Sequence, residues 1–188
     1  RSSIVGLSTG FTYTFTNSGK IFIGVNASVG DYGIINYATF NNNPCAEVYL
    51  SAKLSNHSTF NNNGLLGINT LNAHTNDDPN LLTNNGIIAY PQGNPIPNVT
   101  NNEIIIAPTT ANACNVISPA FTLGSPVDFT IMGIFTDQAA TMSAGTYVTA
   151  TNTFTPTALL AEGAYTYYVK VMDGSGGCTR IIPWQLTT

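Results

Sequence analysis

Alternation of apolar and polar residues with a period of two runs along almost the whole chain, whereas helical periodicity is nearly absent. Phe11, Tyr13 and Phe15 alternate with threonines, which gives this segment one aromatic face and one hydroxyl face. Such a pattern is typical of a half-buried β-strand. We therefore expect an all-β chain, in which the one helical candidate is a single turn at residues 158–162.

Further runs of the same kind follow, and sequences rich in Gly, Asn and Pro separate them. These runs cover residues 20–28, 34–40, 46–54, 64–71, 86–90, 103–107, 127–135, 146–150, 165–172 and 179–186. Short strands at this spacing indicate two packed sheets or a barrel. We predict a two-sheet β-sandwich of jelly-roll or Ig-like type, with one domain over residues 11–188 and an arm at residues 1–10. The clearest local unit is a C-terminal hairpin that turns at residues 173–177.

Charged residues make up only 7% of the chain, and the surface is expected to consist largely of Asn and Thr. Asparagines occur in runs at 41–43, 61–63, 84–85 and 101–102. A surface of neutral hydrogen-bonding groups changes its charge little with pH, which is typical of extracellular structural proteins. Five Lys and Arg residues are too few for a phosphate-binding stripe, so nucleic acid is excluded as a partner.

The expected location is extracellular or at the cell surface. The chain opens at Arg1 rather than at Met, from which we expect that a targeting segment has been removed. No apolar run approaches the roughly 18 residues that a membrane helix needs, so we expect no membrane insertion.

Two kinds of covalent modification follow from this location. Asn26, Asn56 and Asn98 each open an Asn-x-Ser/Thr sequon, and we predict N-glycans on them. The three cysteines lack the close spacing of a zinc site, so one disulfide and one buried thiol are expected, with three buried thiols as the alternative. Of the three possible pairings we predict Cys45 with Cys114, because both follow Asn-rich loops.

No set of residues points to catalysis or to a metal site. His57 adjoins Ser58, but the chain has no Gly-x-Ser-x-Gly elbow. The segment 72–80 is rich in oxygen ligands but lacks the order of an EF-hand loop, and Asx-turns explain the same residues. Glu47, Glu103 and Glu162 show no spacing that selects a carboxylate pair. We predict no enzymatic activity, no metal and no cofactor.

The N-terminal arm is the most informative segment for function. Ile4, Val5 and Leu7 make it apolar and strand-like, and Gly10 separates it from the first predicted strand. A free arm of this kind promotes aggregation in a monomer, whereas it is useful if it fills a groove in a neighbouring subunit. The alternative is an ordinary first strand of the same domain.

An uncharged arm that ends at Gly10, an Asn- and Thr-rich all-β body, scattered sequons and few cysteines look like the subunits of extracellular filaments built by donor-strand complementation. The similarity is to the glycosylated thread filaments of archaea and, more loosely, to chaperone-usher pilins, from which the cysteines depart in number and position. It covers the whole chain and rests on composition and layout. It implies a homopolymer in which each arm completes the sheet of the next subunit.

The expected function is therefore that of a structural subunit of an extracellular filament or pilus, which polymerises head to tail with identical subunits by β-augmentation. Two alternatives stay open. One is an S-layer, capsid or fibre surface domain that assembles through its sheets. The other is a carbohydrate-binding or adhesin module, which exposed aromatic side chains would favour.

Overall fold

The computed structural model describes residues 13–24, 32–91, 94–112, 115–124, 128–173 and 177–188. The chain divides into two compact units. The first contains residues 1–105 and 123–125, and the second contains residues 106–122 and 126–188. The predicted single domain over residues 11–188 thus comprises two units. The described residues include no helix with the length and hydropathy of a membrane span.

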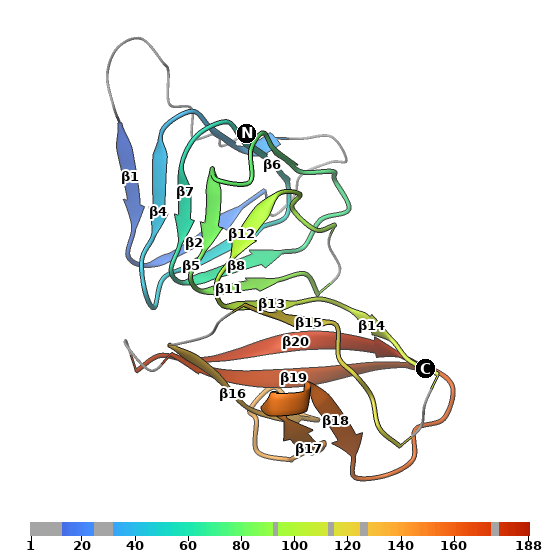
Figure 1. The fold of residues 1–188 in the computed structure, drawn as a ribbon. Coiled ribbons are helices and arrows are strands. Elements are labelled where there is room, and N and C mark those ends of the chain that lie inside the picture. Colours follow the sequence, from blue (N-terminus) through green and yellow to red (C-terminus); the bar gives the residue numbers. More distant parts are fainter. Residues whose placement is uncertain (1–12, 25–31, 92–93, 113–114, 125–127, 174–176) are drawn as a thin grey trace. The chain divides into compact units, whose positions relative to one another are not determined.

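The first unit is a β-solenoid, in which the chain winds repeatedly through three sheets and each circuit forms one coil (Figure 1). The first sheet contains β1 (Thr14–Asn17), β4 (Thr39–Asn42), β7 (Phe60–Asn62), β10 (Leu82–Asn84) and β12 (Val99–Asn101). The second sheet contains β2 (Lys20–Ile23), β5 (Glu47–Leu50), β8 (Leu65–Ile68), β11 (Ile87–Ala89), β13 (Ile104–Ile106) and β15 (Phe121–Leu123). The third sheet contains β3 (Tyr32–Asn36), β6 (Lys53–Asn56) and β9 (Thr75–Asn76).

The predicted two-sheet β-sandwich is wrong. Neighbouring strands of successive coils pair in parallel, as β1 does with β4 and β4 with β7. Alternation shows which side chains of a strand are buried, but it is the same for a parallel coil and for an antiparallel sandwich. The missing signal was a repeat of about 20 residues, which appears in the pairing of Phe40 with Phe60 and of Ser55 with Thr75.

Inward-facing side chains of successive coils stack on one another and form the core of the solenoid. In the first sheet, the ring centroids of Phe15 and Phe40 are 4.9 Å apart and those of Phe40 and Phe60 are 4.5 Å apart. Leu82 and then Val99 continue this column in register. Each aromatic pair contributes about 0.5–1.5 kcal/mol beyond its buried area.

Glycines allow the coils to approach closely where the first sheet turns into the second. A Cβ atom on Gly64 would lie 2.3 Å from the carbonyl oxygen of Ala46, and one on Gly86 would lie 2.3 Å from that of Gly64. Any larger residue would push the coils apart, which explains why Gly follows two of the Asn runs.

The second unit is built around a four-stranded sheet in the order β14 (Thr109–Thr110), β20 (Thr179–Thr187), β19 (Ala164–Asp173) and β16 (Phe129–Phe135). β16, β19 and β20 are antiparallel, and β14 adds a short parallel edge. β17 (Gly145–Val148) and β18 (Thr153–Pro156) form a hairpin with a 3-10 turn, η1 (Thr149–Thr151), between them. The pairing of β19 with β20 confirms the predicted C-terminal hairpin.

Trp184 is the centre of the core of this second unit. Its ring lies 5.1 Å from Phe121 and 5.8 Å from both Phe154 and Tyr167, measured between centroids. The indole Nε1–H donates to Thr109 Oγ1 at 3.0 Å, which satisfies the one polar atom of the buried ring.

Candidate functional site

A ladder of asparagine side chains runs through the solenoid at the corner between its first and second sheets. Asn17, Asn42, Asn62, Asn84 and Asn101 occupy the same position in five successive coils. Each Nδ2 donates to the Oδ1 of the next coil, at 2.9 Å for the first step and 2.7 Å for the others. All the donors therefore point toward later coils, and the ladder has a polarity.

A second hydrogen bond anchors the first four ladder amides to the backbone of the next coil. Asn42 Nδ2 also donates to the carbonyl of Leu65 at 3.1 Å, and Asn62 Nδ2 to that of Ile87 at 3.0 Å. Asn42 and Asn62 are fully buried, so both amide protons must be satisfied within the protein. Asn42, Asn62 and Asn84 are thus core residues, and only their neighbours in the runs belong to the expected polar surface.

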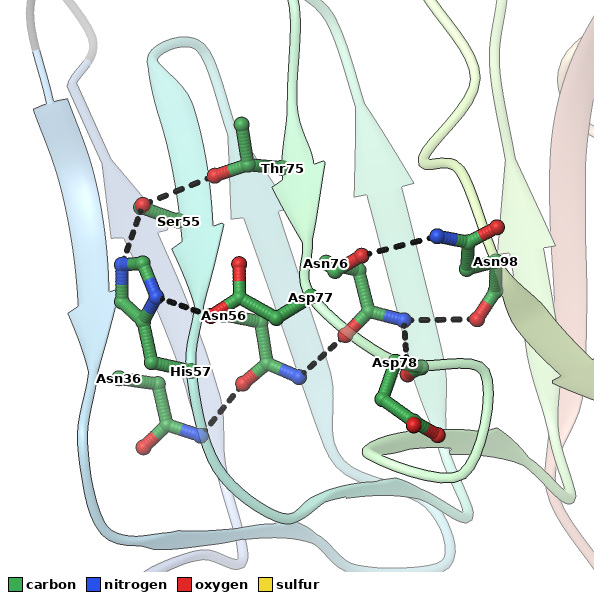
Figure 2. A network of polar contacts seen from close by, with 9 residues as sticks. All are labelled: Asn36, Ser55, Asn56, His57, Thr75, Asn76, Asp77, Asp78 and Asn98. Atoms are coloured by element: carbon green, nitrogen blue, oxygen red, sulfur yellow. Dashed lines mark hydrogen bonds and ion pairs between the residues drawn. The ribbon is translucent and has the colours of Figure 1, made fainter.

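A second ladder follows the third sheet (Figure 2). Asn36 Nδ2 donates to Asn56 Oδ1 and Asn56 Nδ2 to Asn76 Oδ1, both at 2.7 Å. Asn76 Nδ2 then donates to the carbonyl of Asn98 at 2.7 Å, so this ladder ends on the backbone. Its donors also point toward later coils.

Among the described residues, the side-chain oxygens of the first coil accept fewer hydrogen bonds than those inside the ladder. The Oδ1 atoms of Asn17 and Asn36 accept only from the backbone amides of Gly19 (3.0 Å) and Ala38 (3.2 Å) among the described residues. Asn84 Oδ1, inside the ladder, accepts from a backbone amide and from Asn62 Nδ2. Among the described residues, each of these two oxygens thus accepts one hydrogen bond, whereas Asn84 Oδ1 accepts two.

The first coil also presents three edge strands. β1, β2 and β3 each stand at the end of the hydrogen-bonding order of their sheet in the part of the chain that the structure describes. The inward-facing Phe15 of β1 is 37% exposed, whereas Phe40 in the next coil is 1% exposed. In the part of the chain that the structure describes, the inward column is thus less covered at Phe15 than at Phe40.

The last coil is covered in its second sheet. β15 follows β13 in the hydrogen-bonding order, and the backbone amide of Gly124 donates to the carbonyl of Glu103 at 2.6 Å. A Cβ atom on Gly124 would lie 2.8 Å from the carbonyl oxygen of Asn101. The second sheet therefore continues past β13 with β15, whereas β2 stands at its other end among the described residues.

Ser55, His57 and Asp77 form a relay on the outer side of the third sheet (Figure 2). His57 Nδ1 lies 2.6 Å from Asp77 Oδ2, and His57 Nε2 lies 2.8 Å from Ser55 Oγ. Ser55 Oγ also lies 2.8 Å from Thr75 Oγ1, and the ring of Tyr37 stacks on His57 at 4.6 Å. The order of groups is that of a serine hydrolase triad.

The surroundings of Ser55 do not suit acyl transfer. Its residue exposure is 5%, and its hydroxyl is engaged on both sides. β6 pairs with β3 on one side and β9 on the other, so its backbone N–H groups donate within the sheet and do not form an oxyanion hole. Ser55 and Asp77 were not predicted as partners of His57, because a sequence motif reveals only near neighbours in the chain. A spacing of 20 residues relates His57 to Asp77, and the same spacing separates the asparagines of this ladder.

His74 is a buried titratable residue directly before β9 of the same sheet. Its Nδ1 accepts the backbone N–H of Leu54 at 3.0 Å, so the neutral ring carries its proton on Nε2. Nε2 has no hydrogen-bond partner among the described residues. Burial, with a smaller effect of nearby Lys53, lowers the pKa of His74 to about 4.

An exposed aromatic pair lies on the outer side of the second sheet. The rings of Phe22 and Tyr49 stack at 5.1 Å, and Phe22 is 59% exposed. Lys20 Nζ is 5.3 Å and 4.9 Å from these two ring centroids and 2.8 Å from Glu47 Oε2. Hydrogen bonding to Glu47 is the main cause that raises the pKa of Lys20.

The predicted glycosylation sites have different outcomes. Asn26 lies outside the described residues. Asn56 is fully buried and holds two ladder hydrogen bonds, so a glycan on it is incompatible with this fold. Asn98 is exposed and has a positive φ of 55°, so it stays a predicted site.

Cys45 and Cys178 are disulfide-bonded, and Cys114 lies outside the described residues. The second disulfide-bonded cysteine is therefore Cys178 and not the predicted Cys114. Disulfide pairing depends on proximity in the fold, which the neighbouring Asn-rich loops do not reveal. The predicted donor-strand residues Ile4, Val5 and Leu7 also lie outside the described residues.

In the segment 72–80, which offered candidate metal ligands, Asp78 Oδ1 accepts the backbone amide of Asn80 at 2.8 Å. This is the Asx-turn geometry that the alternative interpretation required.

No family model matches this chain, no curated protein matches it, and no solved structure matches it.

Proposed function

We propose that this chain is a structural subunit of an extracellular filament, which polymerises head to tail by β-augmentation at the first coil of the solenoid. The observation that carries this proposal is the exposure of Phe15. Its ring belongs to the core column, yet 37% of the residue is exposed at the open end. Covering such a ring stabilises a complex by about 1–2 kcal/mol.

The β1 edge lacks the features that prevent strand addition. Edge strands of monomeric proteins usually carry charges, prolines or bulges. β1 has the sequence Thr-Phe-Thr-Asn, with no charge and no proline, and Thr14, Phe15 and Thr16 are all exposed. A strand from another subunit can therefore extend the sheet and cover Phe15 in one step.

The Asn17 side chain adds specificity to this edge. A strand that pairs with β1 gains a buried hydrogen bond if it places a donor side chain beside Asn17 Oδ1. Because the second sheet has β2 at one end and β15 at the other among the described residues, identical subunits would join through unlike surfaces. Such a heterologous contact propagates into a filament. The N-terminal arm of a neighbouring subunit, with Ile4, Val5 and Leu7, is the proposed donor strand.

Two variants test this function by electron microscopy and sedimentation of the assembled protein. Deletion of residues 1–9 removes the donor, and Phe15→Asp places a charge at the acceptor. Both should abolish sedimentable filaments. Leu159→Asp is the control, because Leu159 is 73% exposed in a loop of the second unit and should leave assembly unchanged.

Filaments of normal length from both the deletion and Phe15→Asp would refute this mode of assembly. The absence of any polymer from the full chain, over a wide range of concentration and salt, would refute the filament function itself.

A second candidate function is carbohydrate binding, and the exposed Phe22–Tyr49 pair favours it. Aromatic rings beside charged groups stack on sugars and hydrogen-bond to their hydroxyls. Retention on insoluble polysaccharides that Phe22→Ala removes would support this function. Equal retention of Phe22→Ala and the unchanged chain would exclude this pair as the site.

A further inference from the structure

The outer side of the first sheet is a regular array of short uncharged polar side chains, which we call the Thr/Asn face. Its middle rank is Thr16, Asn41, Asn61, Thr83 and Thr100, which stand opposite one another in five neighbouring strands. They alternate along each strand with the buried column of Phe40, Phe60 and Leu82 and so point outward. None of the five is buried.

A second rank runs beside the first at the start of the next corner. It consists of Ser18, Asn43, Asn63, Asn85 and Asn102, and none of these is buried. Hydrogen bonds run along this rank, from Asn43 Nδ2 to Ser18 Oγ at 2.9 Å and from Asn102 Nδ2 to Asn85 Oδ1 at 2.7 Å. Asn85 Nδ2 donates likewise to Asn63 Oδ1 at 3.1 Å. The side chains therefore hold one another in fixed positions.

A third rank begins with Thr14 and Thr39, which pair on the other side of the middle rank. The spacing of the array follows from the sheet. Neighbouring side chains of one rank are about 4.8 Å apart across the strands, and the ranks themselves lie about 6.7 Å apart along a strand. Thr100 Oγ1 donates to the carbonyl of Pro79 at 2.6 Å, and this loop bounds the face at its β12 side.

The chemistry of the face excludes several classes of partner. It carries no Lys, Arg, Asp or Glu, so it offers nothing to a phosphate, an anionic membrane or a charged mineral surface. The aromatic residues of these strands point into the core, so no ring is available to stack on a sugar.

Dry contact with another protein is disfavoured as well. It would remove many hydroxyl and amide groups from water, and a polar group buried without a partner costs about 1–3 kcal/mol. A partner that is itself a hydrogen-bonded lattice imposes no such cost. The oxygen rows of hexagonal ice repeat at distances close to both spacings of the array. Thr hydroxyl and Asn amide groups can therefore hold water in positions that continue the lattice.

We infer that the Thr/Asn face binds ice, through an ordered layer of water held by the ranks of Thr and Asn side chains. This inference does not depend on the proposed filament function.

The test measures thermal hysteresis and the fraction of unglycosylated protein that partitions into a slowly growing ice front. The full chain should be enriched in the ice. Thr83→Lys places a long charged side chain at the centre of the face, and we expect it to reduce the partition at least tenfold. Thr16→Lys, at the exposed β1 strand, should also reduce it and serves if Thr83→Lys fails to fold. Thr166→Lys is the matched control, because Thr166 is exposed on β19 and this variant should partition as the unchanged chain does.

Exclusion of the full chain from the ice, to the extent seen for an ordinary soluble protein, would overturn the inference. Equal partition of folded Thr83→Lys or Thr16→Lys and the unchanged chain would overturn it as well. The inference would also be overturned if the unchanged chain self-associated without partitioning into ice and Thr83→Lys abolished this self-association. The Thr/Asn face would then bind a second copy of this chain.

Discussion

Phe15 stacks on Phe40 with their ring centroids 4.9 Å apart, and yet Phe15 is 37% exposed whereas Phe40 is 1% exposed. The two residues occupy the same inward column of neighbouring coils. Phe40 therefore stabilises the subunit, whereas Phe15 is accessible at the first described coil. This difference can be measured.

We expect Phe40→Ala to lower the free energy of unfolding of the dispersed subunit by about 3–5 kcal/mol, because it creates a cavity between two rings. Phe15→Ala should lower it by only about 1–2 kcal/mol, because its ring is partly exposed. Urea unfolding followed by circular dichroism measures both. Equal losses would show that Phe15 is as well covered as Phe40 in the isolated subunit.

The ladder asparagines are expected to stabilise the fold far more than their neighbours in the same runs. Asn62→Ala removes hydrogen bonds to Asn42, Asn84 and the carbonyl of Ile87, and should cost about 2–4 kcal/mol. Asn61→Ala, one residue away and partly exposed, should cost less than about 1 kcal/mol. Chemical denaturation of the two variants decides this. A cost for Asn61→Ala as large as that for Asn62→Ala would contradict the assignment of the ladder.

Stability should fall between pH 6.5 and pH 4 because of His74. Its pKa is about 4 in the folded state and 6.5 as a model value, so the unfolded chain binds more protons over this range. The contribution of the neutral ring is complete above pH 6.5 and falls by roughly 3 kcal/mol as the pH drops to 4. His74→Gln should remove this part of the pH dependence. Unfolding free energies measured from pH 8 to pH 4 test it, and a curve that is identical for the variant would exclude His74 as the cause.

Ser55 should not react as a nucleophile, although His57 and Asp77 are aligned behind it. A fluorophosphonate probe, which labels activated serines, is expected to leave the folded protein unmodified, because Ser55 is 5% exposed. Mass spectrometry of the treated protein checks this. Labelling at Ser55 that His57→Ala abolishes would reveal a hydrolase site.

A host that glycosylates Asn-x-Ser/Thr sequons should modify Asn98 and leave Asn56 free in the folded chain. Asn56 is fully buried, whereas Asn98 is exposed in a turn. Glycopeptide mapping tests both sites in one experiment. A glycan on Asn56 would show that it is added before folding and that the second ladder is interrupted in the mature protein.

The alternation of residue types was enough to predict β-structure and many strand positions. The pairing of β19 with β20 was predicted correctly, because a hairpin needs only two adjacent alternating runs and a Gly-rich turn. The strand predicted at 20–28 begins, as expected, at Lys20. Local patterns of this kind depend on neighbours in the sequence, which is why the sequence reveals them.

What the sequence by itself determined was therefore the β character of the chain, its low charge and its C-terminal hairpin. Only the tertiary structure decided that the first unit is a parallel solenoid, because alternation does not encode the direction of the neighbouring strand. It also decided the role of each asparagine. Asn61 and Asn62 are the same residue type in the same run, but one points outward and the other is buried in a ladder of amides. That difference arises from contacts between residues about 20 positions apart, which form only when the coils stack.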